Sequence, residues 1–101
     1  MVYVLLLNGA NPLIKVGHAM DVAERVKDYG LAAGYAVDVL LTVTTPSKVD
    51  AIRLEGAVAV EFVASRVPKR IAQKVIQDNG FTECYLTAAA DDICEFVKSQ
   101  A

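Results

Sequence analysis

The fold is decided by residues 1–25, which read MVYVLLLNGANPLIKVGHAMDVAER. Two apolar runs, residues 2–7 and 13–18, flank the dipeptide Asn8-Gly9, the strongest short-range signal for a β-hairpin. The first run is almost continuously apolar, as is typical of a strand covered on both faces. Pro12 marks the far side of the same loop, so we predict a hairpin of two strands.

A helix is expected directly after the second strand. Asp21 and Glu24 form a capping-box-like pattern, which predicts a helix from about Val22 to Tyr29. Val22, Val26 and Tyr29 share one stripe of this helix, so we expect that stripe to be buried. The short connections should bring together four positions: Tyr3, Lys15, Gly17 and Arg25.

The rest of the chain shows two further strand patterns and three helix patterns. Residues 35–45 alternate strictly, which predicts a strand with a more polar face. Its apolar face is expected to hold Val37, Val39, Leu41 and Val43, and its polar face Asp38, Thr42 and Thr44. Helices are expected at 47–65, where Ser47 and Asp50 form a second capping-box-like start, at 68–78 with Asn79-Gly80 as its stop, and at 87–98 with Thr87 as its cap. A short strand is expected at 81–86.

The composition is that of one globular domain spanning residues 1–101. Hydrophobic residues make up 54% of the chain and charged residues 22%, which argues against disorder. A chain of this length can form a core without disulfides or metals. The net charge of −2 lacks the basic character usual for nucleic-acid binders, so any such site would have to be a local patch.

The two cysteines and the first strand indicate a reducing compartment and no membrane. Cys84 and Cys94 belong to no metal-binding or redox motif and fall in apolar positions, so we expect free, buried thiols in the cytoplasm. The opening run MVYVLLL is too short to cross a bilayer and no basic segment precedes it, so it is read as a strand and not a signal peptide.

Glu55 is a carboxylate where apolar side chains are expected. At about 100° per residue, it falls in the middle of the apolar side of helix 47–65. Its neighbours three and four positions away are Ala51, Ile52, Val58 and Ala59. A carboxylate in that place is unfavourable unless it is paired, protonated or bound to a cation. Two interpretations are open: an ion pair, with Arg25 as a candidate partner, and a metal ligand.

The chain resembles the GIY-YIG endonuclease superfamily in its short, single-domain phage and bacterial form. Tyr3 matches the tyrosine that ends the first family motif, and Lys15-Val16-Gly17 occupies the position of the second motif. Arg25 follows at the spacing of the family arginine. Residues 51–55 resemble the helix that carries the metal-binding glutamate, and residues 80–85 resemble the closing strand.

This resemblance implies an α/β fold, α+β in type, with a small, mainly antiparallel sheet of three or four strands flanked by helices. It also implies hydrolysis of DNA with one divalent ion, Mg²⁺ or Mn²⁺, held by Glu55. Arg25 would contact the scissile phosphate and Tyr3 would orient the attacking water. Lys15, which replaces the second family tyrosine, would contact phosphate as a point charge. His18 would transfer a proton or contact phosphate.

Each of these residues also has a purely structural interpretation. Arg25 fits an ion pair, for which the candidate partners are Glu24, Asp28 and Glu55. Tyr3 fits a core residue whose hydroxyl is bonded to the backbone. Lys15 fits an exposed lysine on an edge strand, where it would discourage aggregation. His18 fits an ordinary surface or half-buried histidine.

Four basic residues form the best candidate for a nucleic-acid-binding surface: Arg66, Lys69, Arg70 and Lys74. Residues 66, 70 and 74 step by four and would share a face of the third helical segment. Phosphate contacts along such a face would give salt-sensitive affinity with little sequence readout. A solvated helix face is the alternative.

Three functions are therefore considered. The first is a magnesium-dependent DNA endonuclease, as the resemblance implies. The second is a catalytically silent module that binds nucleic acid or a protein, which the acidic net charge favours. The third is a homodimer formed through the apolar helix that contains AVAVEFVA.

Overall fold

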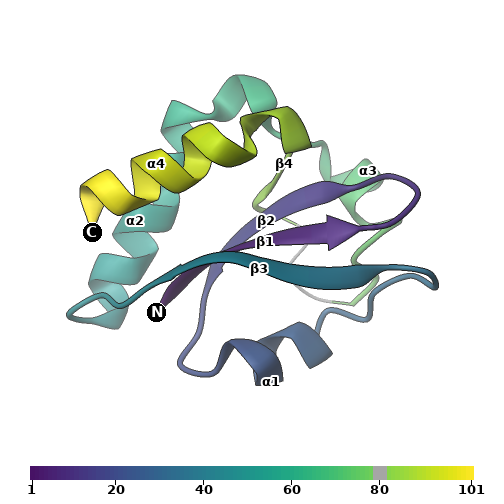
Figure 1. Cartoon of the computed structure of the whole chain (residues 1–101), viewed down its shortest axis with the longest axis horizontal. Coiled ribbons are helices and arrows are strands. Elements are labelled where there is room, and N and C mark those ends of the chain that lie inside the picture. Colours follow the sequence, from purple (N-terminus) through teal and green to yellow (C-terminus); the bar gives the residue numbers. More distant parts are fainter. Residues whose placement is uncertain (79–81) are drawn as a thin grey trace.

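A computed structural model describes residues 1–78 and 82–101 and shows a mixed α/β fold (Figure 1). The strands are β1 (Val2–Asn8), β2 (Leu13–His18), β3 (Ala36–Val43) and β4 (Cys84–Tyr85). The α-helices are α1 (Val22–Lys27), α2 (Lys48–Glu61), α3 (Lys69–Ala72) and α4 (Ala90–Gln100). Short 3₁₀ helices lie at Val63–Ser65 and Thr87–Ala89. The predicted antiparallel sheet with flanking helices is confirmed.

The hairpin of β1 and β2 forms the centre of the sheet. The strand order is β3-β1-β2-β4, and all neighbouring strands are antiparallel. The register pairs Tyr3 with Gly17 and Leu5 with Lys15. Because β4 pairs with β2 at Lys15, this lysine lies on an inner strand, and the predicted edge-strand lysine is wrong.

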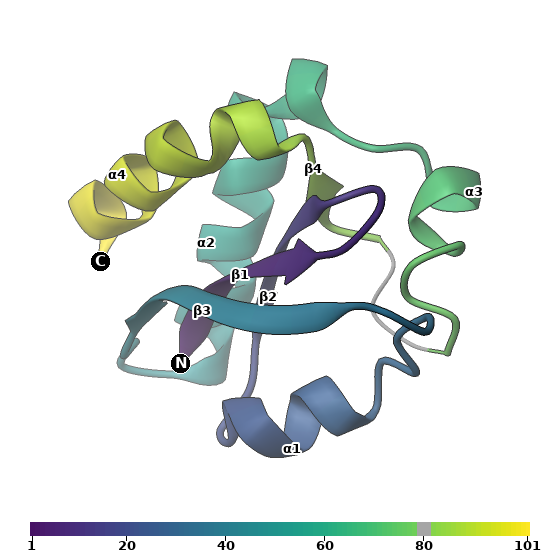
Figure 2. The same cartoon turned by 45° about the vertical axis from the view of Figure 1, so that its right-hand side comes forward.

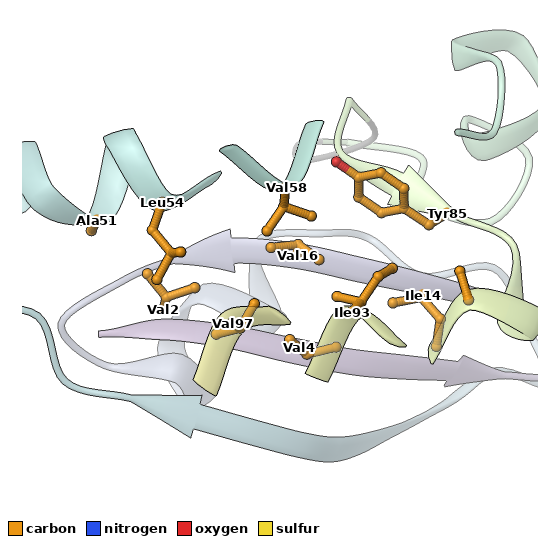
Figure 3. Packing of buried hydrophobic residues seen from close by; sticks show 11 residues of the cluster. Val2, Val4, Ile14, Val16, Ala51, Leu54, Val58, Tyr85, Ile93 and Val97 are labelled. Carbon is orange, nitrogen blue, oxygen red and sulfur yellow. The ribbon is translucent and has the colours of Figure 1, made fainter. Parts of the chain in front are cut away.

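Each face of the sheet is covered by its own hydrophobic core. On one face, Leu54 and Val58 of α2 and Ile93 and Val97 of α4 meet alternate residues of the hairpin (Figure 3). On the other face, the core residues are Tyr3, Leu5, Leu7, Leu13, Tyr29, Val67, Ala72, Val75, Ile76 and Cys84. Figure 2 shows α1 on the side of the sheet away from α2 and α4. The expectation that β1 is covered on both faces is confirmed.

A β-bulge in β3 breaks the predicted alternation. Val4 pairs with Leu41 and Leu5 pairs with Val39, so Leu40 is an extra residue. The odd-numbered side chains before Leu40 and those after it therefore face opposite sides of the sheet. Val37 packs in the core with Tyr29, whereas Leu41 and Val43 pack in the core under α2 and α4. The prediction that all four apolar residues share one face is wrong.

Two of the three predicted helix caps are present, and the helices are shorter than expected. Asp21 accepts a hydrogen bond from the Glu24 N–H, and Ser47 accepts one from the Asp50 N–H. The first helix ends at Lys27, so Tyr29 lies just beyond it. The second ends at Glu61 and is followed by a 3₁₀ turn. Thr87 begins a 3₁₀ turn and makes no capping hydrogen bond.

The segment after α2 is more irregular than the sequence predicts. Only Lys69–Ala72 is α-helical within the expected helix 68–78, because Ile76 leaves the helix to form an antiparallel bridge with Leu31. The expected strand at 81–86 is limited to Cys84–Tyr85 among the described residues. Its first residue and the Asn79-Gly80 stop lie outside the described residues.

Both cysteines are free, as expected, but they are not equally buried. Cys84 is fully buried and Cys94 is half-buried. Burial raises the pKa of Cys84 to about 11, so its thiol stays protonated near neutral pH. In residues 1–78 and 82–101, no helix combines the length and apolar character needed to cross a membrane.

Candidate active site

One cavity of about 880 Å³ is lined by all six residues that the sequence identified as candidate site residues. They are Tyr3, Lys15, Gly17, His18, Arg25 and Glu55. The hairpin supplies four of them, and α1 and α2 supply one each. The predicted proximity of Tyr3, Lys15, Gly17 and Arg25 is therefore confirmed, and Glu55 joins them from a distant part of the sequence.

Gly17 makes room for the hydroxyl end of Tyr3. The two residues are cross-strand partners, and a Cβ atom on residue 17 would collide with the Tyr3 hydroxyl and lie 2.6 Å from its Cζ. Any other residue at this position would have to displace the Tyr3 ring. The glycine of the second motif thus has a steric role here.

A second tyrosine, which the sequence did not indicate as a site residue, contacts Tyr3. The hydroxyl groups of Tyr3 and Tyr29 are hydrogen-bonded, and Tyr29 is fully buried. Tyr3 is thus a core residue, but its hydroxyl is bonded to a side chain and not to the backbone. Burial raises the pKa of Tyr3; Tyr29 and the Arg25 guanidinium lower it by less. In the sequence, Tyr29 falls on the stripe of the first helix that is expected to be buried, which predicts its burial but not its contact with Tyr3.

Lys15 is buried, with only 3% of its surface exposed. Its Nζ lies 3.5 Å from Oε2 of Glu83 and 6.0 Å from the centroid of the Tyr29 ring. Burial lowers the pKa of Lys15, and the Glu83 carboxylate opposes this change without cancelling it. The Lys15 side chain is thus held inside the cavity wall, with its amino group beside the Glu83 carboxylate.

Glu83 is a second cavity carboxylate that sequence reasoning missed. Burial would raise the pKa of Glu83, but the hydrogen bond from the Thr82 hydroxyl and the charge of Lys15 lower it further than burial raises it. Glu83 is consequently ionised near neutral pH and forms an ion pair with Lys15. No sequence pattern connects residues 15 and 83, which only the pairing of β2 with β4 brings together.

Glu55 is hydrogen-bonded to His18. Oε1 of Glu55 lies 2.8 Å from Nδ1 of His18, and their side chains are 17% and 28% exposed. The predicted pairing of Glu55 with Arg25 is therefore wrong. Glu55 also lies at the margin of the buried stripe of α2, and not in its middle, because the stripe consists of Ala51, Leu54 and Val58.

Arg25 is exposed at the cavity and forms no ion pair within residues 1–78 and 82–101. One of its predicted partners, Glu24, is bound instead by Lys27 at 3.1 Å. The Arg25 guanidinium lies beside the Tyr3 hydroxyl, where it favours the phenolate and lowers the pKa of Tyr3 against the larger effect of burial. Arg25 is thus available to an anion that enters the cavity.

The four predicted nucleic-acid-binding residues do not line this cavity. Arg66 lies before α3 in extended backbone and donates a hydrogen bond to the Thr82 carbonyl at 3.0 Å. Lys69 and Arg70 belong to α3, whereas Lys74 follows the end of that helix. The prediction that residues 66, 70 and 74 share one helix face is therefore wrong, although all four side chains are exposed.

The cavity is more basic than the chain as a whole. Its lining includes Lys15, Arg25 and Lys48 as cations and Glu55 and Glu83 as carboxylates. The chain as a whole has a net charge of −2. Positive charge is thus concentrated where the candidate site residues meet, which suits an anionic ligand.

No family model, curated protein or solved structure matches this chain. The assignment of a function therefore depends on the geometry of the cavity.

The residues of the cavity fit a single divalent ion with many water ligands. In the described ranges, no group of three or more histidine, cysteine or acidic residues could form a closed metal site. Glu55 nevertheless lines the cavity, and only its Oε1 is hydrogen-bonded within those ranges. Mg²⁺ commonly takes one or two carboxylates and retains several waters, so a site with the single carboxylate of Glu55 is compatible with this ion.

Proposed function

We propose that the chain is a DNA endonuclease of the GIY-YIG type that uses one Mg²⁺ or Mn²⁺ ion. The observation that supports this proposal best is the convergence of Tyr3, Arg25 and Glu55, from three separate elements, on one cavity. The excess of cations in the lining supports a phosphate-bearing substrate.

In this proposal Glu55 holds the divalent ion through its carboxylate. When bound, such an ion polarises the phosphoryl group and stabilises the negative charge that develops on the phosphate oxygens. The His18 imidazole fixes the orientation of Glu55 through Oε1 and leaves Oε2 to the ion. The divalent ion would then bind Oε2 of Glu55, while His18 is hydrogen-bonded to Oε1.

Arg25 and Lys15 bind the phosphate. The guanidinium of Arg25 can donate two parallel hydrogen bonds to phosphate oxygens, and it has no competing carboxylate in residues 1–78 and 82–101. Lys15 supplies a point charge whose position is fixed by Glu83 and by its burial.

Tyr3 orients the attacking water. Because burial raises the pKa of Tyr3, its hydroxyl remains protonated at neutral pH and acts as a hydrogen-bonding group. The hydrogen bond to Tyr29 restrains this hydroxyl at the cavity wall. Orientation of this kind lowers the entropic part of the barrier.

The test is nicking of supercoiled plasmid with Mg²⁺ or Mn²⁺. Wild-type protein should nick the plasmid, and Glu55→Gln should reduce the rate at least about 100-fold while leaving the thermal midpoint close to that of wild type. Glu61→Gln is the matched control, because Glu61 is exposed on the same helix and does not line the cavity. Equal nicking by Glu55→Gln and wild type would remove Glu55 from the mechanism.

The second candidate function is a catalytically silent module that binds nucleic acid. The hydrogen bond between His18 and Glu55 favours it, because the imidazole already occupies one oxygen of the carboxylate that would attract a cation. This function predicts salt-sensitive binding of fluorescent DNA without nicking in either metal. A location in the cytoplasm belongs to both candidates and is supported by the two free cysteines.

A further inference from the structure

The outward face of α2 is apolar and uncovered in the described part of the chain. Val49, Ile52 and Val60 are 63%, 50% and 78% exposed. Helical periodicity places them on the side opposite Leu54 and Val58, which point toward the sheet (Figure 3). The helix thus has one apolar face in the core and a second one in solvent.

Gly56 lies at the centre of this outward face and is not explained by one copy of the chain. Glycine is among the least favourable residues inside a helix. The backbone φ of Gly56 is not positive, and a Cβ atom there would meet no other atom within 4 Å. Neither the backbone nor the packing of the monomer therefore requires glycine, whereas the close approach of a second helix would.

The apolar residues are spaced symmetrically about Gly56. Ile52 and Val60 lie at equal sequence distances on either side, and so do Val49 and Val63, which is 65% exposed in the following 3₁₀ turn. Two antiparallel copies related by a two-fold axis at Gly56 would therefore place Ile52 of each copy against Val60 of the other. A two-fold interface requires this kind of self-complementary surface.

We propose that the chain forms a homodimer through the α2 stripe, defined as Val49, Ile52, Gly56, Val60 and Val63. A second copy is the occupant that the stripe fits, because the apolar residues on either side of Gly56 mirror one another and the surface can therefore pack against itself.

The size of the α2 stripe sets the strength of the dimer. A helix of 14 residues is about 21 Å long and about 10–12 Å wide, so the two copies together cover roughly 400–500 Å². Stable interfaces bury about 1,200–2,000 Å². The dimer is accordingly of the weak, transient class, with a dissociation constant of roughly 10 μM to 1 mM.

Sedimentation velocity between about 10 μM and 1 mM tests the proposal and does not depend on nuclease activity. The weight-average mass of wild type should rise from 10.8 kDa toward twice that value. Val60→Glu should stay monomeric over the whole range. Val39→Glu is the matched control, because Val39 is 56% exposed on β3 and lies outside the α2 stripe, so this variant should associate like wild type.

Substitutions at Gly56 test the position of the axis. Gly56→Ala should weaken association at least about 10-fold, because the added methyl group separates the two helices at their closest point. In a Cys94→Ser background, Gly56→Cys should form a disulfide with its own copy on mild oxidation, whereas Glu61→Cys should not. A wild-type monomer at about 1 mM, or equal association of Val60→Glu and Val39→Glu, would overturn the proposal.

Discussion

A methyl group added to Gly17 tests the cavity at its most crowded point. In Gly17→Ala the new Cβ would collide with the Tyr3 hydroxyl and lie 2.6 Å and 2.9 Å from the Tyr3 Cζ and Cε1 atoms. Tyr3 cannot turn aside freely, because its ring is buried and its hydroxyl is bonded to Tyr29. Overpacking of this kind costs about 1–3 kcal/mol, and loss of the hydroxyl–hydroxyl bond adds about 1 kcal/mol.

Gly17→Ala should therefore lower the free energy of unfolding by about 2–4 kcal/mol, which corresponds to roughly 10–25 °C in the thermal midpoint. Urea titration followed by circular dichroism measures this change. Gly56→Ala is the matched control, because the same substitution in open space inside a helix should raise the free energy of unfolding by up to about 1 kcal/mol. The two variants should thus shift stability in opposite directions.

A double-mutant cycle connects the loss to Tyr3. Because the hydroxyl is the atom nearest to the added Cβ, Tyr3→Phe should recover part of the cost of Gly17→Ala, with a coupling of about 1 kcal/mol. The steric account would be refuted if Gly17→Ala stayed within about 0.5 kcal/mol of wild type. It would equally be refuted if the substitution cost the same with and without the hydroxyl.

Two further predictions concern buried groups of the core. Tyr85→Phe should raise the free energy of unfolding by about 1 kcal/mol near neutral pH, because the Tyr85 hydroxyl is buried without a partner in the described ranges. Burial also raises the pKa of Tyr85 to about 12. Between about pH 10 and about pH 12 the Tyr85 hydroxyl therefore ionises in the unfolded chain but stays protonated in the folded chain, so wild type loses stability over this range. Urea midpoints across this range should fall less for Tyr85→Phe, and an unchanged slope would contradict the assignment. Iodoacetamide should alkylate the half-buried Cys94 well before Cys84, because burial raises the pKa of Cys84 to about 11. Mass spectrometry of the digested protein measures the order of labelling. Faster labelling of Cys84 would show that the core around it opens.

The parts of the fold that depend on neighbouring residues in the sequence were predictable. The hairpin, the caps at Asp21 and Ser47, and the apolar run of β1 each depend on a few neighbouring residues, and the structure contains all of them. The Asn8-Gly9 signal predicted the hairpin but not its connection, which is a loop of residues 9–12 in which Gly9 has no positive φ. The grouping of Tyr3, Lys15 and Gly17 follows from the hairpin register.

The features that sequence reasoning missed depend on contacts between distant segments. Glu55 pairs with His18, and Lys15 pairs with Glu83, only because α2 and β4 pack beside the hairpin. Helix α3 ends early because Ile76 pairs with Leu31, far away in the sequence. Periodicity within one segment carries no information about these pairings.

The bulge at Leu40 has a consequence for the behaviour of the chain at high concentration. β3 is an edge strand of eight residues, and its outer backbone groups are not paired within the sheet. An incoming strand needs an uninterrupted row of donors and acceptors, and the extra residue interrupts that row. The irregularity that divides the apolar side chains of β3 between two cores thereby also protects the sheet against growth into fibrous aggregates.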